Sequence, residues 1–90
     1  MSNNLRFVAK IVKACVQNKG RFLTIRQLSK IAGMSYNATY RTVHSLRDEN
    51  VLNLTKIGSA SVVQLTDTEK TRGFIALAES YSTGKNEKKK

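Results

Sequence analysis

The sequence predicts a mainly α-helical domain with one small β-hairpin (α+β): a three-helix core, a two-stranded hairpin and a C-terminal helix. Apolar residues recur at helical spacing through most of residues 4–49, interrupted by glycines at positions 20 and 33. Residues 52–65 instead alternate with period two on either side of a Gly-Ser pair, which is typical of a hairpin. Helical spacing then returns from residue 69 onward.

Length and composition limit the chain to one small domain. Ninety residues bury only about 60% of the surface that the unfolded chain exposes, so the core is small. We place the folded domain at residues 1–82. Residues 83–90 are polar and rich in lysine, and we expect them to form a basic, disordered tail.

Positive charge dominates the chain and is concentrated in its N-terminal half. The formal net charge is +10, of which the last six residues contribute three, leaving +7 for residues 1–84. Nine lysine and arginine residues precede the first acidic residue, Asp48. A basic domain of this kind favours a polyanion, above all a nucleic acid, as its partner.

Several functions are disfavoured by the residues present. We find no Ser/His/Asp or Cys/His set, glycine-rich phosphate loop or cluster of metal ligands, so we expect neither an enzyme nor a metal or cofactor site. Cys15 lies among apolar residues and is expected in the core. The apolar run from Phe7 to Val16 is interrupted by Lys10 and Lys13, and no segment reaches the ~20 apolar residues of a membrane span. We expect a cytoplasmic, nucleoid-associated protein that binds no membrane and no evident small-molecule ligand.

The first helix is expected from residue 4 to residue 18, closed by Gly20. Its apolar residues cover well over half of its circumference, more than the ~100° stripe that a surface helix needs. We expect a domain of this size to leave part of that surface uncovered, which makes this helix a candidate subunit interface. Together with the C-terminal helix, the expected homodimer contact comprises Leu5, Phe7, Val8, Ile11, Phe74, Leu77 and Tyr81.

A second, shorter helix follows a short extended link at residues 22–23. Thr24 and Gln27 have the spacing of a capping box, in which each side chain accepts a hydrogen bond from the backbone amide of the other. The helix that begins there is expected to direct Leu28 and Ile31 inward.

A third helix follows after a tight turn. Gly33 supplies the left-handed residue that stops the preceding helix, and Ser35 is a good N-cap for the next one. That helix is expected to run to about residue 49, with Asn50 as its left-handed stop. Its spacing turns one face toward the core: Thr39, Thr42, Val43 and Leu46.

The remaining segments are the hairpin and the last helix. Residues 52–57 and 61–65 form the two expected strands. Thr66 and Glu69 have the spacing of a second capping box, which predicts that the last helix opens there. Phe74, Leu77, Ala78 and Tyr81 share one face of that helix.

Three features of the sequence together resemble the winged helix-turn-helix family, in particular its small MarR-like and PadR-like regulators. They are the pattern Leu28-Ser-x-Ile-Ala-Gly-Met-Ser35, the spacing of Val43 and Leu46, and the turn at Asn50-Val-Leu52. The resemblance covers residues 5–82, including the hairpin and the final helix. In that family the second helix of the unit enters the major groove of DNA, and the hairpin, called the wing, lies over the backbone. The resemblance therefore implies double-stranded DNA as the partner.

Side chains on the outer face of the third helix agree with this interpretation. An arginine can contact guanine through two hydrogen bonds, and an asparagine can do the same with adenine. A tyrosine can donate to phosphate or pack on a thymine methyl group. The alternative is that the tyrosines cover an edge of the core and that Arg41 is merely solvated. The expected base-facing residues are Tyr36, Asn37, Tyr40, Arg41 and His44.

A second set of residues is expected at the DNA backbone. Ser35 can offer its hydroxyl or the adjacent helix N-terminal amides to a phosphate, although capping alone also explains it. The small residues at the tip of the hairpin allow its backbone amides to approach phosphates closely. Since this wing carries no arginine, we expect it to position the protein rather than to specify sequence. The set comprises Arg26, Lys30, Ser35, Lys56, Gly58, Ser59 and Ser61.

The sequence therefore predicts a sequence-specific DNA-binding transcriptional regulator that acts as a homodimer on a pseudo-palindromic site. Two alternatives remain open. One is a DNA-coating chromatin or plasmid-segregation protein with little sequence preference. The other is a winged helix that binds protein or RNA, for which the outer face of the third helix is dispensable for DNA affinity.

Overall fold

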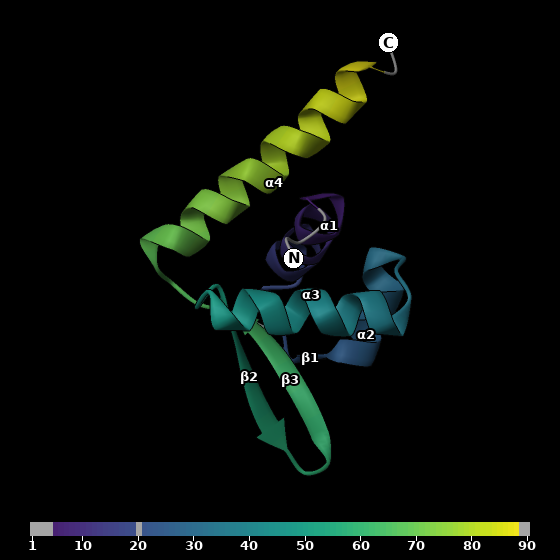
Figure 1. The fold of residues 1–90 in the computed structure, drawn as a ribbon, viewed down its shortest axis with the longest axis vertical. Coiled ribbons are helices and arrows are strands. Elements are labelled where there is room, and N and C mark those ends of the chain that lie inside the picture. The colour runs from purple at the N-terminus through teal and green to yellow at the C-terminus, as the bar shows by residue number, and fades with distance from the viewer. Residues whose placement is uncertain (1–4, 20, 89–90) are drawn as a thin grey trace.

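The computed structural model describes the backbone of residues 5–19 and 21–88, and the side chains of these residues as far as residue 80. The elements follow the predicted order, with one added strand: α1 (Leu5–Gln17), β1 (Leu23–Thr24), α2 (Ile25–Ala32), α3 (Tyr36–Asp48), β2 (Leu52–Ile57), β3 (Ala60–Leu65) and α4 (Glu69–Lys88). The β2–β3 hairpin projects from one end of the helical body, and α4 projects from the other (Figure 1). The predicted α+β class is confirmed.

The sheet has three antiparallel strands in the order β1-β3-β2, one strand more than the sequence predicts. Leu23 pairs with Val63 and Thr24 with Val62, where only an extended link is predicted. Two residues are too short a segment to show any period, and they become a strand only because the edge of β3 is available to them. The hairpin itself is confirmed, with the pairs running from Leu52↔Leu65 to the tip.

The local signals around α2 and α3 are confirmed. The Thr24 hydroxyl accepts from the Gln27 amide at 3.1 Å, and the Gln27 side chain accepts from the Thr24 amide at 3.0 Å. Gly33 is left-handed with φ 69°, as is Asn50 with φ 66°. The Ser35 hydroxyl caps α3 by accepting from the amide of Ala38 at 3.1 Å. These caps fix where α3 begins and ends.

The inner face of α3 is buried as expected. The side chains of Thr39, Thr42, Val43 and Leu46 are 0–3% exposed. Both threonine hydroxyls donate at 2.8 Å to carbonyl oxygens one turn earlier in the helix, so their polar groups are satisfied inside the core. This anchoring holds the opposite face of α3 toward solvent.

The expectation that Ile31 faces inward is wrong, because its side chain is 47% exposed. The buried side of α2 is formed by Ile25, Leu28 and Ser29. At 100° per residue, Ile31 is rotated by about 110° from the centre of that stripe. The simple recurrence of apolar residues at i and i+3 overestimated the width of the buried face.

The apolar surface of α1 is covered mostly by other parts of the same chain. α4 packs along α1 (Figure 1). Val8 is 4% exposed and Ile11 is 0% exposed, so their predicted place in a contact between subunits is wrong. They belong to the hydrophobic core, in which α1 contacts α2, α3, α4 and β3, so this small domain covers more of α1 than its sequence predicts. Leu5 remains 47% exposed and Phe7 is half-buried.

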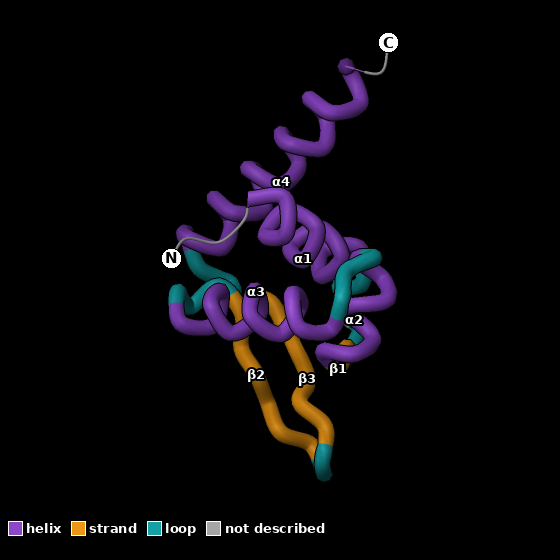
Figure 2. Tube along the Cα trace, turned by 45° about the vertical axis from the view of Figure 1, so that its right-hand side comes forward, coloured by secondary structure: helices purple, strands orange, loops and turns teal. Residues whose placement is uncertain are grey.

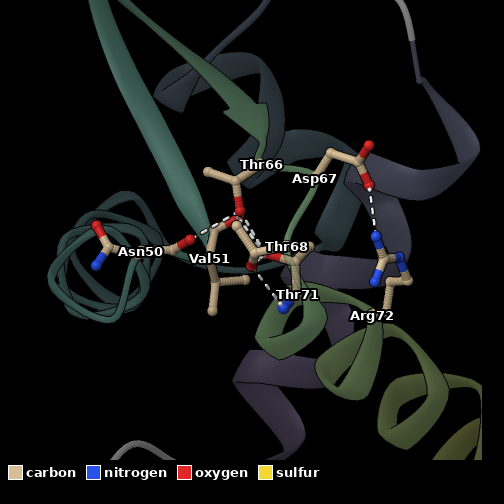
Figure 3. A network of polar contacts seen from close by, with 7 residues as sticks. All are labelled: Asn50, Val51, Thr66, Asp67, Thr68, Thr71 and Arg72. Atoms are coloured by element: carbon tan, nitrogen blue, oxygen red, sulfur yellow. Dashed lines mark hydrogen bonds and ion pairs between the residues drawn. The ribbon is translucent and has the colours of Figure 1, made fainter.

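The predicted capping box at Thr66 and Glu69 is also wrong, since Thr68 caps α4. The Thr68 hydroxyl accepts from the Thr71 amide at 3.2 Å. The Thr66 hydroxyl instead donates to the Asn50 carbonyl at 2.7 Å and lies in hydrogen-bond contact with the Thr71 hydroxyl (Figure 3). This threonine cluster joins the end of α3, the end of β3 and the first turn of α4.

α4 continues to Lys88, beyond the boundary predicted at residue 82. Helical backbone therefore occupies residues 83–88, where a disordered tail is expected. Extending an existing helix costs far less than nucleating a new one, and Lys and Glu are good helix formers. Residues 89–90 and the side chain of Tyr81 lie outside the described part of the chain.

Candidate nucleic-acid interface

The five predicted base-facing residues lie together on the solvent side of α3. We call them the α3 surface: Tyr36, Asn37, Tyr40, Arg41 and His44. Tyr36 and Tyr40 are 48% and 45% exposed, Asn37 and Arg41 are exposed, and His44 is half-buried. α3 lies across the front of the molecule in both views, with the hairpin projecting below it (Figure 2).

The α3 surface has a crest and a flank. At 100° per residue, Asn37, Arg41 and His44 lie within about 30° of the direction opposite the buried stripe. Tyr36 and Tyr40 are rotated away from this crest toward one side of the helix. The polar side chains therefore project farthest from the protein, and the two tyrosines border them.

The three aromatic side chains of this surface contact one another. The ring centroids of Tyr36 and Tyr40 are 6.2 Å apart with an interplanar angle of 30°. Those of Tyr40 and His44 are 4.2 Å apart with an angle of 44°. These residues were predicted to share a face, but their mutual contacts were not predicted, although the i, i+4 spacing is the signal for them. Such packing restricts the rotamers of the tyrosines.

Two acidic residues, Asp48 and Glu49, lie at the C-terminal end of α3. Among the described residues, Asp48 is 3.5 Å from Arg47 and Glu49 is 2.7 Å from Lys70. The hydrogen bond and positive charge of Lys70 hold the pKa of Glu49 below its usual value. No acidic residue occurs in the N-terminal half of the chain, which includes the first turns of α3. A polyanion is therefore attracted to the N-terminal half of α3, where the positive end of the helix dipole also lies.

The predicted backbone-contacting residues lie on the elements adjoining α3. Arg26 and Lys30 are exposed on α2, whereas Lys56, Gly58 and Ser59 are exposed on the hairpin. Ser61 is half-buried on β3, in register with Lys56. Ser35 is exposed, and its hydroxyl serves as the cap of α3. No residue between Asn50 and Thr66 is acidic, so the wing carries only positive charge.

The exposure of one apolar residue of the wing was not predicted from the sequence. Ile57, the last residue of β2, is 52% exposed beside the turn at Gly58. In the period-two alternation it shares a face with Asn53 and Thr55, a break in the pattern that could have revealed its exposure. At this point the hairpin has extended beyond the core, so an apolar side chain finds no cover.

Other kinds of site are not found among the described side chains. Within residues 5–19 and 21–80, no group of three or more His, Cys, Asp or Glu side chains is placed to hold a metal ion. No helix of that part of the chain is long and apolar enough to cross a membrane. Cys15 is buried, and burial raises the pKa of its thiol to about 12.

Three solved structures show what this arrangement is similar to. Sso10a-2, a DNA-binding protein from Sulfolobus solfataricus, matches with a TM-score of 0.73 and 15% identity, over 96% of this chain and 84% of that one. The antimony-specific transcriptional repressor AntR matches with a TM-score of 0.69 and 16% identity, over 90% and 68% of the two chains. The MarR family transcriptional regulator SPO1453 from Silicibacter pomeroyi matches with a TM-score of 0.57 and 18% identity, over 92% and 54%.

No protein-family model and no curated protein sequence matches this chain. At these identities the structural likeness concerns the fold: four helices and a three-stranded antiparallel sheet in a winged helix-turn-helix arrangement. The predicted fold is thereby confirmed. The three proteins are described as DNA-binding or as regulators of transcription, and none as an enzyme.

Proposed function

We propose that this chain is a sequence-specific DNA-binding transcriptional regulator that places the N-terminal half of α3 in the major groove. The α3 surface carries the proposal, because its side chains are exposed and its inner face is locked into the core. An α-helix fits the major groove, where each base pair shows a distinct pattern of donors and acceptors. Two proteins of similar fold, one described as DNA-binding and the other as a transcriptional repressor, support DNA as the partner.

The bases are contacted by the crest of the α3 surface, which consists of Asn37, Arg41 and His44. Arg41 makes no ion pair with any described residue, so its guanidinium is available for the two acceptors of a guanine. Asn37, one turn earlier, has the amide that adenine requires. The carboxylates at the C-terminal end of α3 are paired with Arg47 and Lys70, so this end attracts phosphates less than the N-terminal end, which favours an approach with the N-terminal end foremost.

The phosphates are contacted by the elements beside α3, which are α2 and the wing. Arg26 and Lys30 on α2 and Lys56 on the wing are exposed and make no ion pair within the described part of the chain. Each phosphate that these residues neutralise releases counterions, so affinity falls as salt is raised. The glycine and serine residues at the wing tip allow the backbone to approach DNA closely.

We further propose that the active form is a homodimer joined through the outer sides of α1 and α4. Apolar groups remain available there: Leu5 is 47% exposed, Leu77 is 45% exposed, and Phe7 and Phe74 are half-buried. α4 also projects beyond the body of the protomer (Figure 1). A two-fold dimer sets two recognition helices about 34 Å apart, which requires a pseudo-palindromic site.

The test is selection of preferred sequences from a pool of random duplexes, followed by affinity measurements on the selected duplex. Arg41→Ala is expected to weaken binding by about 1–3 kcal/mol and to relax preference at one base pair. Arg47→Ala is the matched control, because Arg47 lies on the same helix but is paired with Asp48. An equal loss on random duplexes would make Arg41 a phosphate contact, and a pool without any enrichment would refute sequence-specific binding.

A further inference from the structure

The two tyrosine rings on α3 are far enough apart to contact different base pairs. Their ring centroids are 6.2 Å apart. Successive base pairs of B-DNA rise by about 3.4 Å along the helix axis and are also rotated about it, so this distance exceeds the rise of one step. Each ring can therefore contact a base of its own.

The exposed surface of these rings is mainly apolar. Nearly half of each tyrosine is in contact with solvent, and a hydrogen bond from the hydroxyl to a phosphate leaves the ring itself in water. Thymine is the one base that presents a methyl group in the major groove. Packing a ring against that methyl removes apolar surface from water on both sides.

The rings are also held before DNA arrives. Tyr36 stacks on Tyr40, and Tyr40 contacts His44 with ring centroids 4.2 Å apart. His44 is half-buried and contacts Tyr40 from the crest side of α3. A side chain already restricted in this way loses less conformational entropy when it binds.

We propose that Tyr36 and Tyr40 each read the methyl group of a separate thymine in the DNA site. The two tyrosines are then specificity-determining residues, and the preferred site contains two thymines beneath the flank of α3. The inference rests on the proposed function, since it requires α3 in the major groove.

The first experiment uses the unmodified protein and the duplex selected from the random pool. Each thymine in turn is replaced by deoxyuridine, which removes the methyl group and keeps every hydrogen-bonding atom of the base. We expect two thymine positions within one half-site at which the replacement weakens binding about 3- to 5-fold, as burial of one methyl group predicts. The other thymines of that half-site are expected to tolerate the replacement within two-fold.

Variants then assign each position to a ring. Tyr36→Ala is expected to remove the sensitivity to deoxyuridine at one of the two positions, and Tyr40→Ala at the other. Tyr36→Phe and Tyr40→Phe are expected to keep both affinity and sensitivity, because they retain the ring. Phe22→Ala is the matched control, since Phe22 is 63% exposed but lies outside α3. Circular dichroism and thermal melting verify that each variant is folded.

The outcomes separate this inference from the function on which it rests. A selected duplex that binds tightly, with no thymine sensitive to deoxyuridine, overturns the reading of methyl groups and leaves sequence-specific binding intact. A large loss for both phenylalanine variants also overturns it, because it assigns the hydroxyls to phosphate. Failure to select any duplex refutes the proposed function itself.

Discussion

Arg41 and Arg47 lie on the same helix and meet opposite electrostatic surroundings. Arg47 is 3.5 Å from Asp48, whereas Arg41 has no carboxylate partner among the described residues. An exposed ion pair of this kind contributes little to stability, so the difference concerns availability for a ligand rather than folding. The amphipathic spacing of α3 predicted that Arg41 is exposed, but the distribution of its neighbours became visible only in the fold.

The ionisation of the Cys15 thiol tests whether this side chain is buried in the core. Its side chain is 6% exposed, and burial raises the pKa of the thiol from its usual 9.0 to about 12. Between these values the unfolded chain releases the thiol proton and the folded chain keeps it. The stability gained from burying the neutral thiol is therefore complete below pH 9 and is lost as the pH rises toward 12.

We predict that raising the pH from 8 to 10 lowers the free energy of unfolding of the wild-type protein by about 1 kcal/mol more than that of Cys15→Ala. Urea denaturation of both proteins at the two pH values measures this difference. The alanine variant serves as the control for lysine and tyrosine groups that titrate in the same range. Identical losses in the two proteins would mean that the thiol is not buried in its neutral form.

At the scale of elements, the turn between α2 and α3 sets the position of the α3 surface. Gly33 has φ 69° and no heavy atom near the site of an added Cβ, so the cost of a side chain there is conformational. Gly73, in α4, also has open space around an added Cβ, but its φ is not in the left-handed region. The two glycines therefore form a matched pair.

We predict that Gly33→Ala lowers the free energy of unfolding by about 1–2 kcal/mol, the usual cost of a left-handed residue with a side chain. Gly73→Ala is expected to raise stability by about 0.5–1 kcal/mol, because alanine is the better helix former. Thermal or urea unfolding measures both. A Gly33→Ala protein as stable as the wild type, or more stable, would contradict the turn geometry described for Gly33.

The elements differ in how well they could be predicted, and the reason is the range of the interactions that define them. The caps of α2 and α3 depend on residues three apart, and the sequence contains the whole signal. β1 exists only because β3, some 40 residues later, offers an edge. Thr66 was misassigned for the same reason, since its partner carbonyl on Asn50 is distant in sequence.

At the scale of the whole molecule, the chain has two projecting parts and one basic half. The wing extends from one end and α4 from the other (Figures 1 and 2). Local periodicity could not reveal how much of α1 the other elements cover, and Val8 and Ile11 were therefore assigned to the wrong surface. Among the described apolar side chains of α1 and α4, Leu5 and Leu77 are the most accessible.

We predict that Leu77→Asp shifts the protein from dimer to monomer, because it places a charge in the proposed contact between subunits. Sedimentation equilibrium over a range of protein concentrations measures the change. Ile31→Asp is the matched control, since Ile31 is 47% exposed on α2 and lies outside that contact. A folded Leu77→Asp protein with unchanged mass would remove α4 from the interface.

The most direct measurement compares affinity for the selected duplex with affinity for a shuffled duplex of the same composition. The wild-type protein is expected to prefer the selected duplex by about 10³-fold or more. In a variant with Asn37, Arg41 and His44 changed to alanine, this ratio is expected to fall to about 10 or less, while affinity for the shuffled duplex is largely kept through Arg26, Lys30 and Lys56. A folded variant that retained the wild-type ratio would show that the crest of α3 does not read DNA sequence.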